Sequence, residues 1–302
     1  MVANSEVGFG AQHRLRGIVL VLTAALVFAC MDTVGKYLMT HFSVPFVAFV
    51  RYGVNLVLLT AIFAPRHGRG LWKTQQTGLV VLRGASLAAA TFFAGLALQR
   101  MPVGETVSIF YLQTFGVLLA SGYFLGERVG LAGWLAAAAG FAGVLLIARP
   151  GGALDSTGVA MALICALVSV IYVLLSRKLA ATESTMAMLF HVAVAGTLLF
   201  SVMLLFGWQP LTLQWTDVAL LLFMGAASLA AHFLFTAAYR LAPASILAPF
   251  SYFHIAFAVV LSWLVYDHFP DRWAIVGMAM IAGSGAAIAL HSHFSKPEPQ
   301  EA

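Results

Sequence analysis

The chain has 302 residues, of which 62% are apolar and 9% are charged, and its formal net charge is +5. Average soluble domains carry roughly 25% charged residues, so this composition excludes a water-soluble globule and fits a chain that spans a lipid bilayer. The basic balance does not indicate a nucleic-acid partner, because the Lys and Arg residues lie mainly at the ends of apolar runs. We therefore expect a lipid bilayer around the chain and no bound nucleic acid.

Ten apolar runs follow one another along the sequence, each long enough to cross a membrane. A helix of about 20 residues, rising 1.5 Å per residue, crosses a hydrocarbon core of about 30 Å. Short turn and polar segments separate the runs, leaving tails at 1–16 and 291–302 and no room for a soluble domain. The sequence predicts an all-α integral membrane protein with ten transmembrane helices, at 17–39, 44–64, 77–98, 103–123, 130–148, 157–179, 185–206, 217–239, 244–265 and 272–290.

The distribution of Lys and Arg predicts how this multi-pass chain is oriented. With the N-terminus inside, ten of the sixteen Lys and Arg residues lie on inner loops, tails and inner run ends, three on outer loops and outer run ends, and three deeper within the runs. Inner loops of membrane proteins carry an excess of these residues. We therefore expect both termini in the cytoplasm.

An internal repeat divides the chain into two halves, 17–148 and 157–290. Each half contains five runs, an odd number, so the second half enters the membrane from the opposite side. Inverted repeats of this kind are typical of secondary transporters, in which two similar halves exchange conformations around a site at the membrane midplane. The repeat has one constant offset of 141 residues, which pairs Lys36 with Arg177, Gly84–Ala85 with Gly225–Ala226, Phe92 with Phe233, Pro102 with Pro243 and Tyr111 with Tyr252.

Several segments share a pattern of residues with one known group. They are Leu125–Gly126–Glu127–Arg128–Val129 with Trp134 and 140–146, Arg51 in 49–52, and the stretches 97–102 and 248–252. Together they resemble the drug/metabolite transporter superfamily in its ten-helix EamA branch. The resemblance covers nearly the whole chain and is weak for cargo. Members of that branch include exporters of amino acids and opine-type metallophores and importers of riboflavin or S-adenosylmethionine, so it implies a small-molecule substrate and a location in the cell inner membrane.

Charged residues inside the runs are the first candidates for a transport site, because burying a charge in a membrane is costly. Asp32 and Arg51 fall at a similar depth in the outer half, where they can pair as a gate or proton-sensitive switch, or as a structural ion pair. Arg83 lies six residues into its run without an obvious acidic neighbour. It either binds an anionic ligand or extends its side chain to the inner surface. Lys36 and Glu105, near outer helix ends, are expected to be solvated.

Three histidines, His191, His232 and His254, occur within runs of the second half. At the 141-residue offset they correspond to Val50, Thr91 and Gln113 of the first half. Imidazoles in one half indicate an asymmetric ligand surface or a proton acceptor, and interhelical hydrogen bonding is the alternative. Gln113 and His254 fall near the midplane, within one turn of Tyr111 and Tyr252. Widely spaced histidines do not indicate a metal site, and no cofactor is expected. The predicted substrate-binding residues are Arg83, Tyr111, Gln113, His191, His232, Tyr252 and His254.

Motifs of enzymes and of ATP-driven pumps are missing from the sequence. We find no His-Glu-x-x-His, no Gly-x-Ser-x-Gly and no phosphate-binding loop, so an intramembrane enzyme is a remote alternative. The favoured function is secondary export of an amino-acid-derived zwitterion or an opine-type metallophore, and the alternative is import of riboflavin, S-adenosylmethionine or a similar nutrient.

A glycine strip that includes Gly143 and Gly277 is expected to allow close contact between helices within the chain. The same strip is also compatible with a homodimer.

Overall fold

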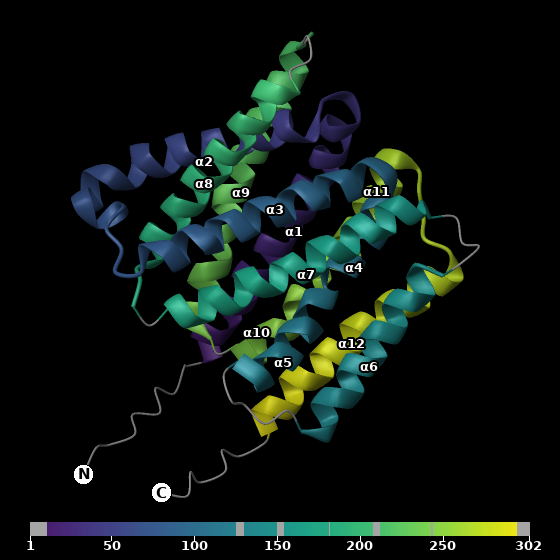
Figure 1. The fold of residues 1–302 in the computed structure, drawn as a ribbon. Helices are drawn as coiled ribbons and strands as arrows, with labels where there is room; N and C mark the ends of the chain where they lie inside the picture. The colour runs from purple at the N-terminus through teal and green to yellow at the C-terminus, as the bar shows by residue number, and fades with distance from the viewer. Residues whose placement is uncertain are drawn as a thin grey trace, which may run out of the picture.

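A computed structural model describes residues 11–124, 130–149, 154–180, 182–207, 212–242 and 244–294. These residues form helices and connecting segments, with no strand among them, which confirms the all-α class. The helices, shown in Figure 1, are α1 (Ala11–His41), α2 (Val44–His67), the short η1 (Gly68–Leu71), α3 (Thr77–Arg100), α4 (Val103–Phe110), α5 (Leu112–Phe124), α6 (Leu131–Ile147), α7 (Ser156–Leu179), α8 (Thr185–Phe206), α9 (Trp215–Leu241), α10 (Ala244–Ser251), α11 (Phe253–Tyr266) and α12 (Arg272–Phe294).

The described helices make ten crossings. Eight stretches are apolar and at least 18 residues long, and α6 and α12 contribute shorter apolar helices. Two crossings consist of two helices each, α4 with α5 and α10 with α11, so each half has five. The start of α1 and the end of α12 lie at one end of the bundle, which we call the termini end (Figure 1). Because α3 follows α1 and α2 along the bundle, the turn between α3 and α4, at Met101 and Pro102, lies at the other end, the far end.

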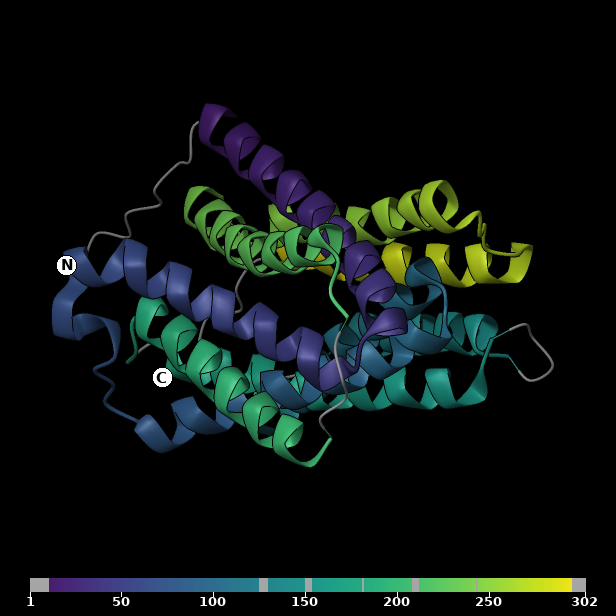
Figure 2. The same cartoon turned by 90° about the horizontal axis from the view of Figure 1, so that it is seen from above.

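The two halves repeat each other helix by helix. Corresponding helices begin 141 residues apart: α2 and α8 at Val44 and Thr185, α4 and α10 at Val103 and Ala244, α5 and α11 at Leu112 and Phe253, and α6 and α12 at Leu131 and Arg272. The halves interlock, since α1 packs along α9, α3 along α7, and α6 along α12. Figure 1 shows α6 and α12 side by side, and the view from above in Figure 2 shows α1 along α9 and α2 along α8. The predicted pair of inverted five-helix repeats is confirmed.

Each repeat contains a helix break at a tyrosine. Tyr111 separates α4 from α5, and Tyr252 separates α10 from α11. The backbone switches to shorter turns there, because the amide of Thr114 donates to the carbonyl of Tyr111 at 3.0 Å and the amide of Ile255 donates to that of Tyr252 at 3.0 Å. In the second repeat Pro249 lies inside α10, three residues before the break, whereas the first repeat breaks without a proline.

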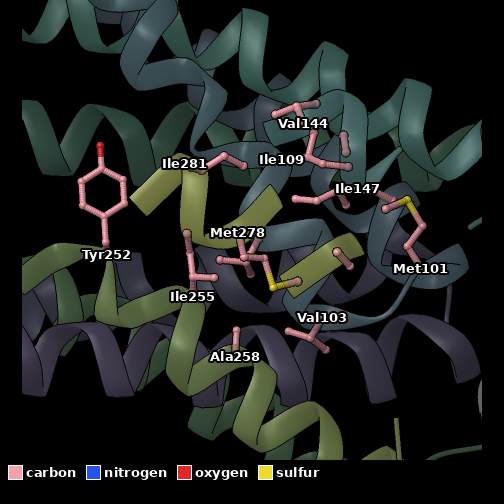
Figure 3. Close-up of a cluster of buried hydrophobic side chains, with 14 of the residues drawn as sticks. Met101, Val103, Ile109, Val144, Ile147, Tyr252, Ile255, Ala258, Met278 and Ile281 are labelled. Atoms are coloured by element: carbon pink, nitrogen blue, oxygen red, sulfur yellow. The ribbon is translucent and has the colours of Figure 1, made fainter. Parts of the chain in front are cut away.

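A cluster of apolar side chains around α4, α6, α11 and α12 forms the largest part of the core (Figure 3). Within it α6 and α12 approach closely at Gly143 and Gly277, where a Cβ on Gly143 would lie 2.6 Å from the carbonyl oxygen of Gly277. A larger residue would force the helices apart. This contact confirms, for this pair, the expected use of glycine in packing within the chain.

Candidate functional site

A cavity of about 500 Å³ lies between helices of both repeats. It extends from Asp32 and Phe110, midway along the bundle, to Thr185 and Met188 in the first turns of α8 at the termini end. Aromatic side chains form much of its wall, among them Phe28, Tyr172 and Phe235. Seven of the nine residues predicted for substrate binding or gating line it: Asp32, Arg51, Arg83, Tyr111, Gln113, His232 and His254.

Arg83, on α3, is a buried cation held by neutral partners. Its side chain is 5% exposed, so it does not reach the inner surface. Its Nε donates to Ser176 Oγ at 2.6 Å, Nη1 to the Met188 carbonyl at 3.2 Å and Nη2 to Tyr172 Oη at 2.9 Å. No described carboxylate pairs with it. The guanidinium has five N–H groups, so donors and an unbalanced charge remain for an anion in the cavity.

Arg51, on α2, makes fewer hydrogen bonds than Arg83. Its Nη2 donates to Thr91 Oγ1 at 3.3 Å, and its guanidinium lies 4.9 Å from the ring centre of Tyr52. Its Nε is buried and has no hydrogen-bond partner among the described residues. A buried donor without a partner is unfavourable, so Arg51 is the cation whose hydrogen bonds a ligand is best placed to complete.

Asp32, on α1, contacts the second repeat. Its Oδ2 lies 3.0 Å from Nε2 of His254, so the ring N–H donates to the carboxylate. A pair between Asp32 and Arg51, which their shared depth allowed, is not formed. The reason is helix packing: α1 packs against α11, which carries His254, and contacts α2 much less. The Asp32–His254 contact joins the repeats and leaves Arg51 without a carboxylate partner in the described chain.

The two tyrosines at the helix breaks occupy different environments. Tyr111 lines the cavity, and its hydroxyl donates to the carbonyl of Ser251 at 2.7 Å. Tyr252 does not line the cavity; it is buried in the α4–α6–α11–α12 core, with its ring centre 4.9 Å from that of Tyr111. Tyr252 therefore packs against the ring of Tyr111 without contacting the cavity.

The remaining predicted residues divide between the cavity and the scaffold. Gln113 and His232 line the cavity, and the ring of His232 stands edge-on to Phe28 at 5.2 Å. His191 does not line it; its Nδ1 lies 2.9 Å from the carbonyl of Ala187 on its own helix. His191 thus behaves as an internally bonded helix residue.

Ser176 was not predicted, although it makes the shortest hydrogen bond to Arg83. It lies four residues after Tyr172, one helical turn along α7, so both present their oxygens on one face. Pairs of hydroxyl groups at this spacing are the sequence pattern that would have found it.

Among the described lining residues the cavity has two arginines and one carboxylate, and its chemistry suits an anionic or zwitterionic organic molecule.

Comparison with known proteins places the chain. The model of the EamA-like transporter family matches residues 15–149 and again 156–290. The chain belongs to the EamA-like transporter family. It is accordingly a multi-pass membrane transporter of small molecules and not an enzyme.

Named relatives of this EamA-like chain differ in cargo and direction. It is 28% identical to the riboflavin transporter of Vibrio cholerae, over 91% of this chain and 93% of the relative. It is 24% identical to the S-adenosylmethionine uptake transporter of Rickettsia conorii (88% and 90%) and 23% identical to the pseudopaline exporter CntI of Pseudomonas aeruginosa (88% and 93%). A solved crystal structure superposes with a TM-score of 0.66 at 18% identity, covering 94% of this chain and 98% of that one, which shows the shared fold.

Proposed function

We propose that this transporter carries a small organic metabolite with a carboxylate or similar anionic group by alternating access, and that it exports an amino-acid-derived zwitterion or an opine-type metallophore. One observation carries the proposal: Arg83 and Arg51 line the same cavity, and the Asp32 carboxylate in its lining is bonded to His254. The cavity therefore has an excess of positive charge in a low-dielectric bundle, where an anionic group compensates it.

The two arginines divide the work of binding. Arg83 is fixed in position by three hydrogen bonds, so its guanidinium is pre-organised to receive a carboxylate. Arg51 adds donors from α2. Asp32 and His254 lie where they can stabilise the ammonium group of a zwitterion. Because Asp32 pairs with His254 and not with Arg51, the coupling role predicted for Asp32 and Arg51 passes in our proposal to Asp32 and His254.

Export is favoured by the side on which the cavity lies. Its lining reaches the termini end through Thr185 and Met188, and the Lys and Arg distribution predicts that end to be cytoplasmic. A cytoplasmic cargo would thus meet Arg83 directly. The relative named as a pseudopaline exporter supports this direction, and the location we propose is the cell inner membrane with both termini in the cytoplasm.

Import of a ring-bearing nutrient is the second candidate. It is favoured by the aromatic wall of Phe28, Tyr111 and Phe235, which suits stacking of a planar ring, and by the relatives named as riboflavin and S-adenosylmethionine transporters. In this case the arginines would bind polar groups at the edge of the ring system.

A metabolite comparison followed by flux measurements tests both candidates. Cells lacking the protein should accumulate the exported cargo inside, and the excess should disappear when the wild-type chain, but not Arg83→Met, is restored. The identified metabolite should then enter proteoliposomes saturably, with uptake stimulated by unlabelled cargo on the other side. Depletion inside together with a growth requirement would establish import, and unsaturable flux would reject a carrier.

A further inference from the structure

Lys36, on α1, is bonded to the C-terminal end of α3. Its Nζ donates to the carbonyls of Leu98 at 2.8 Å and Met101 at 2.7 Å. The Leu98 carbonyl would normally accept from the amide four residues later, but that residue is Pro102, which has no N–H. A helix C-terminus also carries partial negative charge. Lys36 therefore satisfies an unmatched carbonyl and ties α1 to α3 at the far end.

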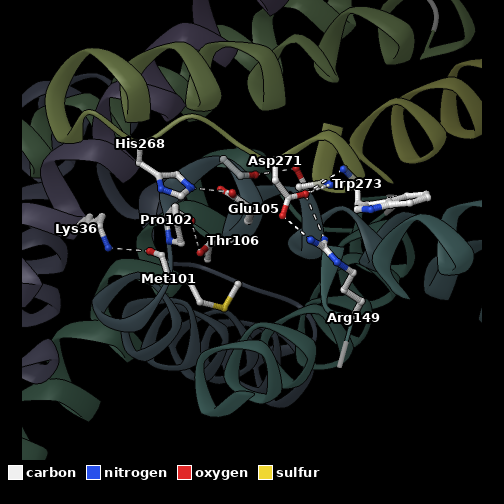
Figure 4. A network of polar contacts seen from close by, with 12 residues as sticks. Lys36, Met101, Pro102, Glu105, Thr106, Arg149, His268, Asp271 and Trp273 are labelled. Carbon is white, nitrogen blue, oxygen red and sulfur yellow. Dashed lines mark hydrogen bonds and ion pairs between the residues drawn. The ribbon is translucent and has the colours of Figure 1, made fainter. Parts of the chain in front are cut away.

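Further contacts close the same end of the bundle (Figure 4). Glu105, in the first turn of α4, is 3% exposed and its Oε1 lies 2.9 Å from Nε2 of His268, which follows α11. The expectation that Lys36 and Glu105 are solvated is thus wrong: Lys36 is half-buried and Glu105 fully buried. None of these residues lines the cavity, and all of them lie at or just beyond the far-end termini of α1, α3, α4 and α11.

The second repeat contains the same parts at the termini end. Arg177 on α7 is the counterpart of Lys36, and Tyr239 and Ala242 are the counterparts of Leu98 and Met101. The carbonyl of Tyr239 is likewise unmatched within its helix, because the residue four positions later is Pro243. The ends of α3 and α9 correspond, with Met101 and Ala242 as their C-caps.

The contact that Lys36 makes at the far end is not made by its counterpart Arg177 at the termini end in the described part of the chain. Arg177 is exposed, and no hydrogen bond or ion pair joins it to another described residue. In the described part of the chain no side chain donates to the carbonyls of Tyr239 or Ala242. The helices differ in the same way: α1 packs against α3 and α4 against α11, whereas α7 with α9 and α10 with α5 show no comparable packing over the described ranges.

We infer that Lys36 and Arg177 are alternating latches of the transport cycle. In the state seen here Lys36 holds the far end closed; in the other state Arg177 donates to the carbonyls of Tyr239 and Ala242 and holds the termini end closed. The inference rests on the proposed alternating-access function, and it assigns gating residues that lie outside the cavity. Each latch stabilises one state, so removing it shifts the population to the other.

Labelling of a cavity cysteine from each face tests this without any cargo. The reporter is Ser169→Cys, a near-isosteric change at the cavity wall, in a Cys30→Ala/Cys165→Ala background. A membrane-impermeant maleimide is applied to intact cells and to inverted vesicles, and a tag after Ala302 identifies the termini face. Lys36→Gln should raise the labelling rate from the far face by about tenfold, and Arg177→Gln should lower it by a similar factor.

Matched variants make the result specific. Lys178→Gln removes the same charge from the exposed neighbour of Arg177 and should leave labelling unchanged, as should Lys36→Arg and Arg177→Lys. The double variant Lys36→Gln/Arg177→Gln should return to the parent rate.

The latches are rejected if both single variants shift labelling in the same direction, if neither shifts it, or if Lys178→Gln matches Arg177→Gln. If Lys36→Gln is not recovered folded, the comparison of Arg177→Gln with Lys178→Gln decides alone. Saturable flux with unresponsive labelling would reject the latches but keep the carrier, whereas unsaturable flux would reject the carrier.

Discussion

The two repeats share a scaffold but differ in the chemistry that they present to the cavity. The lining charges come from the first repeat, and the corresponding positions of the second repeat are apolar. The second repeat supplies two imidazoles in return, His232 opposite Thr91 and His254 opposite Gln113. The charged residues and their counterparts are Asp32 and Val173, Arg51 and Val192, and Arg83 and Met224.

This difference separates the features that we assign to the proposed conformational cycle from those that we assign to the cargo. Under the proposed alternating access, features present in both repeats, such as the tyrosine breaks and the corresponding residues Lys36 and Arg177, are expected to serve an exchange of conformations that needs two similar halves. Features present in one repeat are expected to serve a ligand that has no twofold symmetry. Replacing a first-repeat residue by its counterpart should therefore damage cargo handling more than folding.

The largest effect is expected from Arg83→Met, which installs the residue found at position 224. Loss of the guanidinium removes charge-assisted hydrogen bonds worth about 1.5–3 kcal/mol each, so kcat/KM for the anionic cargo should fall about a hundredfold or more. Thermal stability in detergent should stay equal or rise, because a buried cation without a carboxylate partner is unfavourable.

Arg83→Lys is the control for this change, since it keeps the charge but loses the planar array of donors. It should retain part of the activity. Transport within about threefold of the wild type in Arg83→Met would show that the residue is structural, and the asymmetry between the repeats would then not describe cargo binding.

Arg51→Val, which installs the residue of position 192, should have the next largest effect, on the order of thirtyfold in KM. Arg51 has a buried Nε without a described partner, so it gives up few protein hydrogen bonds when removed. Binding should weaken while the melting temperature changes little. A large loss of stability with unchanged KM would instead identify Arg51 as a helix-locking residue.

Asp32→Val should reveal whether the cargo carries a cation. For a zwitterion, loss of the carboxylate removes the partner of the ammonium group, and uptake should fall about tenfold. An analogue that lacks the ammonium group should be transported at least as well as by the wild type, because the cavity becomes more positive. Equal losses for both compounds in proteoliposomes would mean that Asp32 acts through His254 and not on the cargo.

Sequence reasoning reached the scaffold because it depends on periodic features. Apolar run length and the 141-residue offset depend on counting along the chain, and helix starts such as Val44 and Thr185 keep that spacing in the structure. The break at Tyr111 was not foreseen, since the residues around it have no proline or glycine that would mark it.

The site was less predictable because counting residues along a run gives the depth of a side chain in the membrane but not the helix that it faces. Asp32 and Arg51 share a depth, but α1 faces α11, and Asp32 meets His254 instead. Lys36 looked like an interfacial cation because the unmatched carbonyl of Leu98 becomes visible as its partner only when α1 and α3 are placed side by side.

The smallest effect is expected at the far-end surface, from Asp271→Gly, which installs the residue of position 130. Asp271 Oδ1 accepts from the amides of Trp273 and Ala274, both at 2.9 Å, and its Oδ2 lies 2.5 Å from Arg149 Nη2 (Figure 4). Glycine is itself a tolerated N-cap, and exposed ion pairs are worth about 0–1 kcal/mol. Transport should be unchanged and stability should fall by about 1 kcal/mol or less.

The pH dependence of the melting temperature separates the effect of the ionised Asp271 carboxylate from the effect of removing the side chain. The hydrogen bond from Arg149 is the main cause that lowers the pKa of Asp271 from 3.8 to about 2. A carboxyl whose pKa is lowered by folding stabilises the fold above its unfolded pKa, and this contribution disappears as pH falls through the folded value. The difference in melting temperature between wild type and Asp271→Gly should therefore be constant above about pH 4 and shrink toward pH 2. A difference that stayed constant down to pH 2 would assign the effect to backbone entropy at the glycine, and the ionised pair with Arg149 would contribute nothing to closing this end.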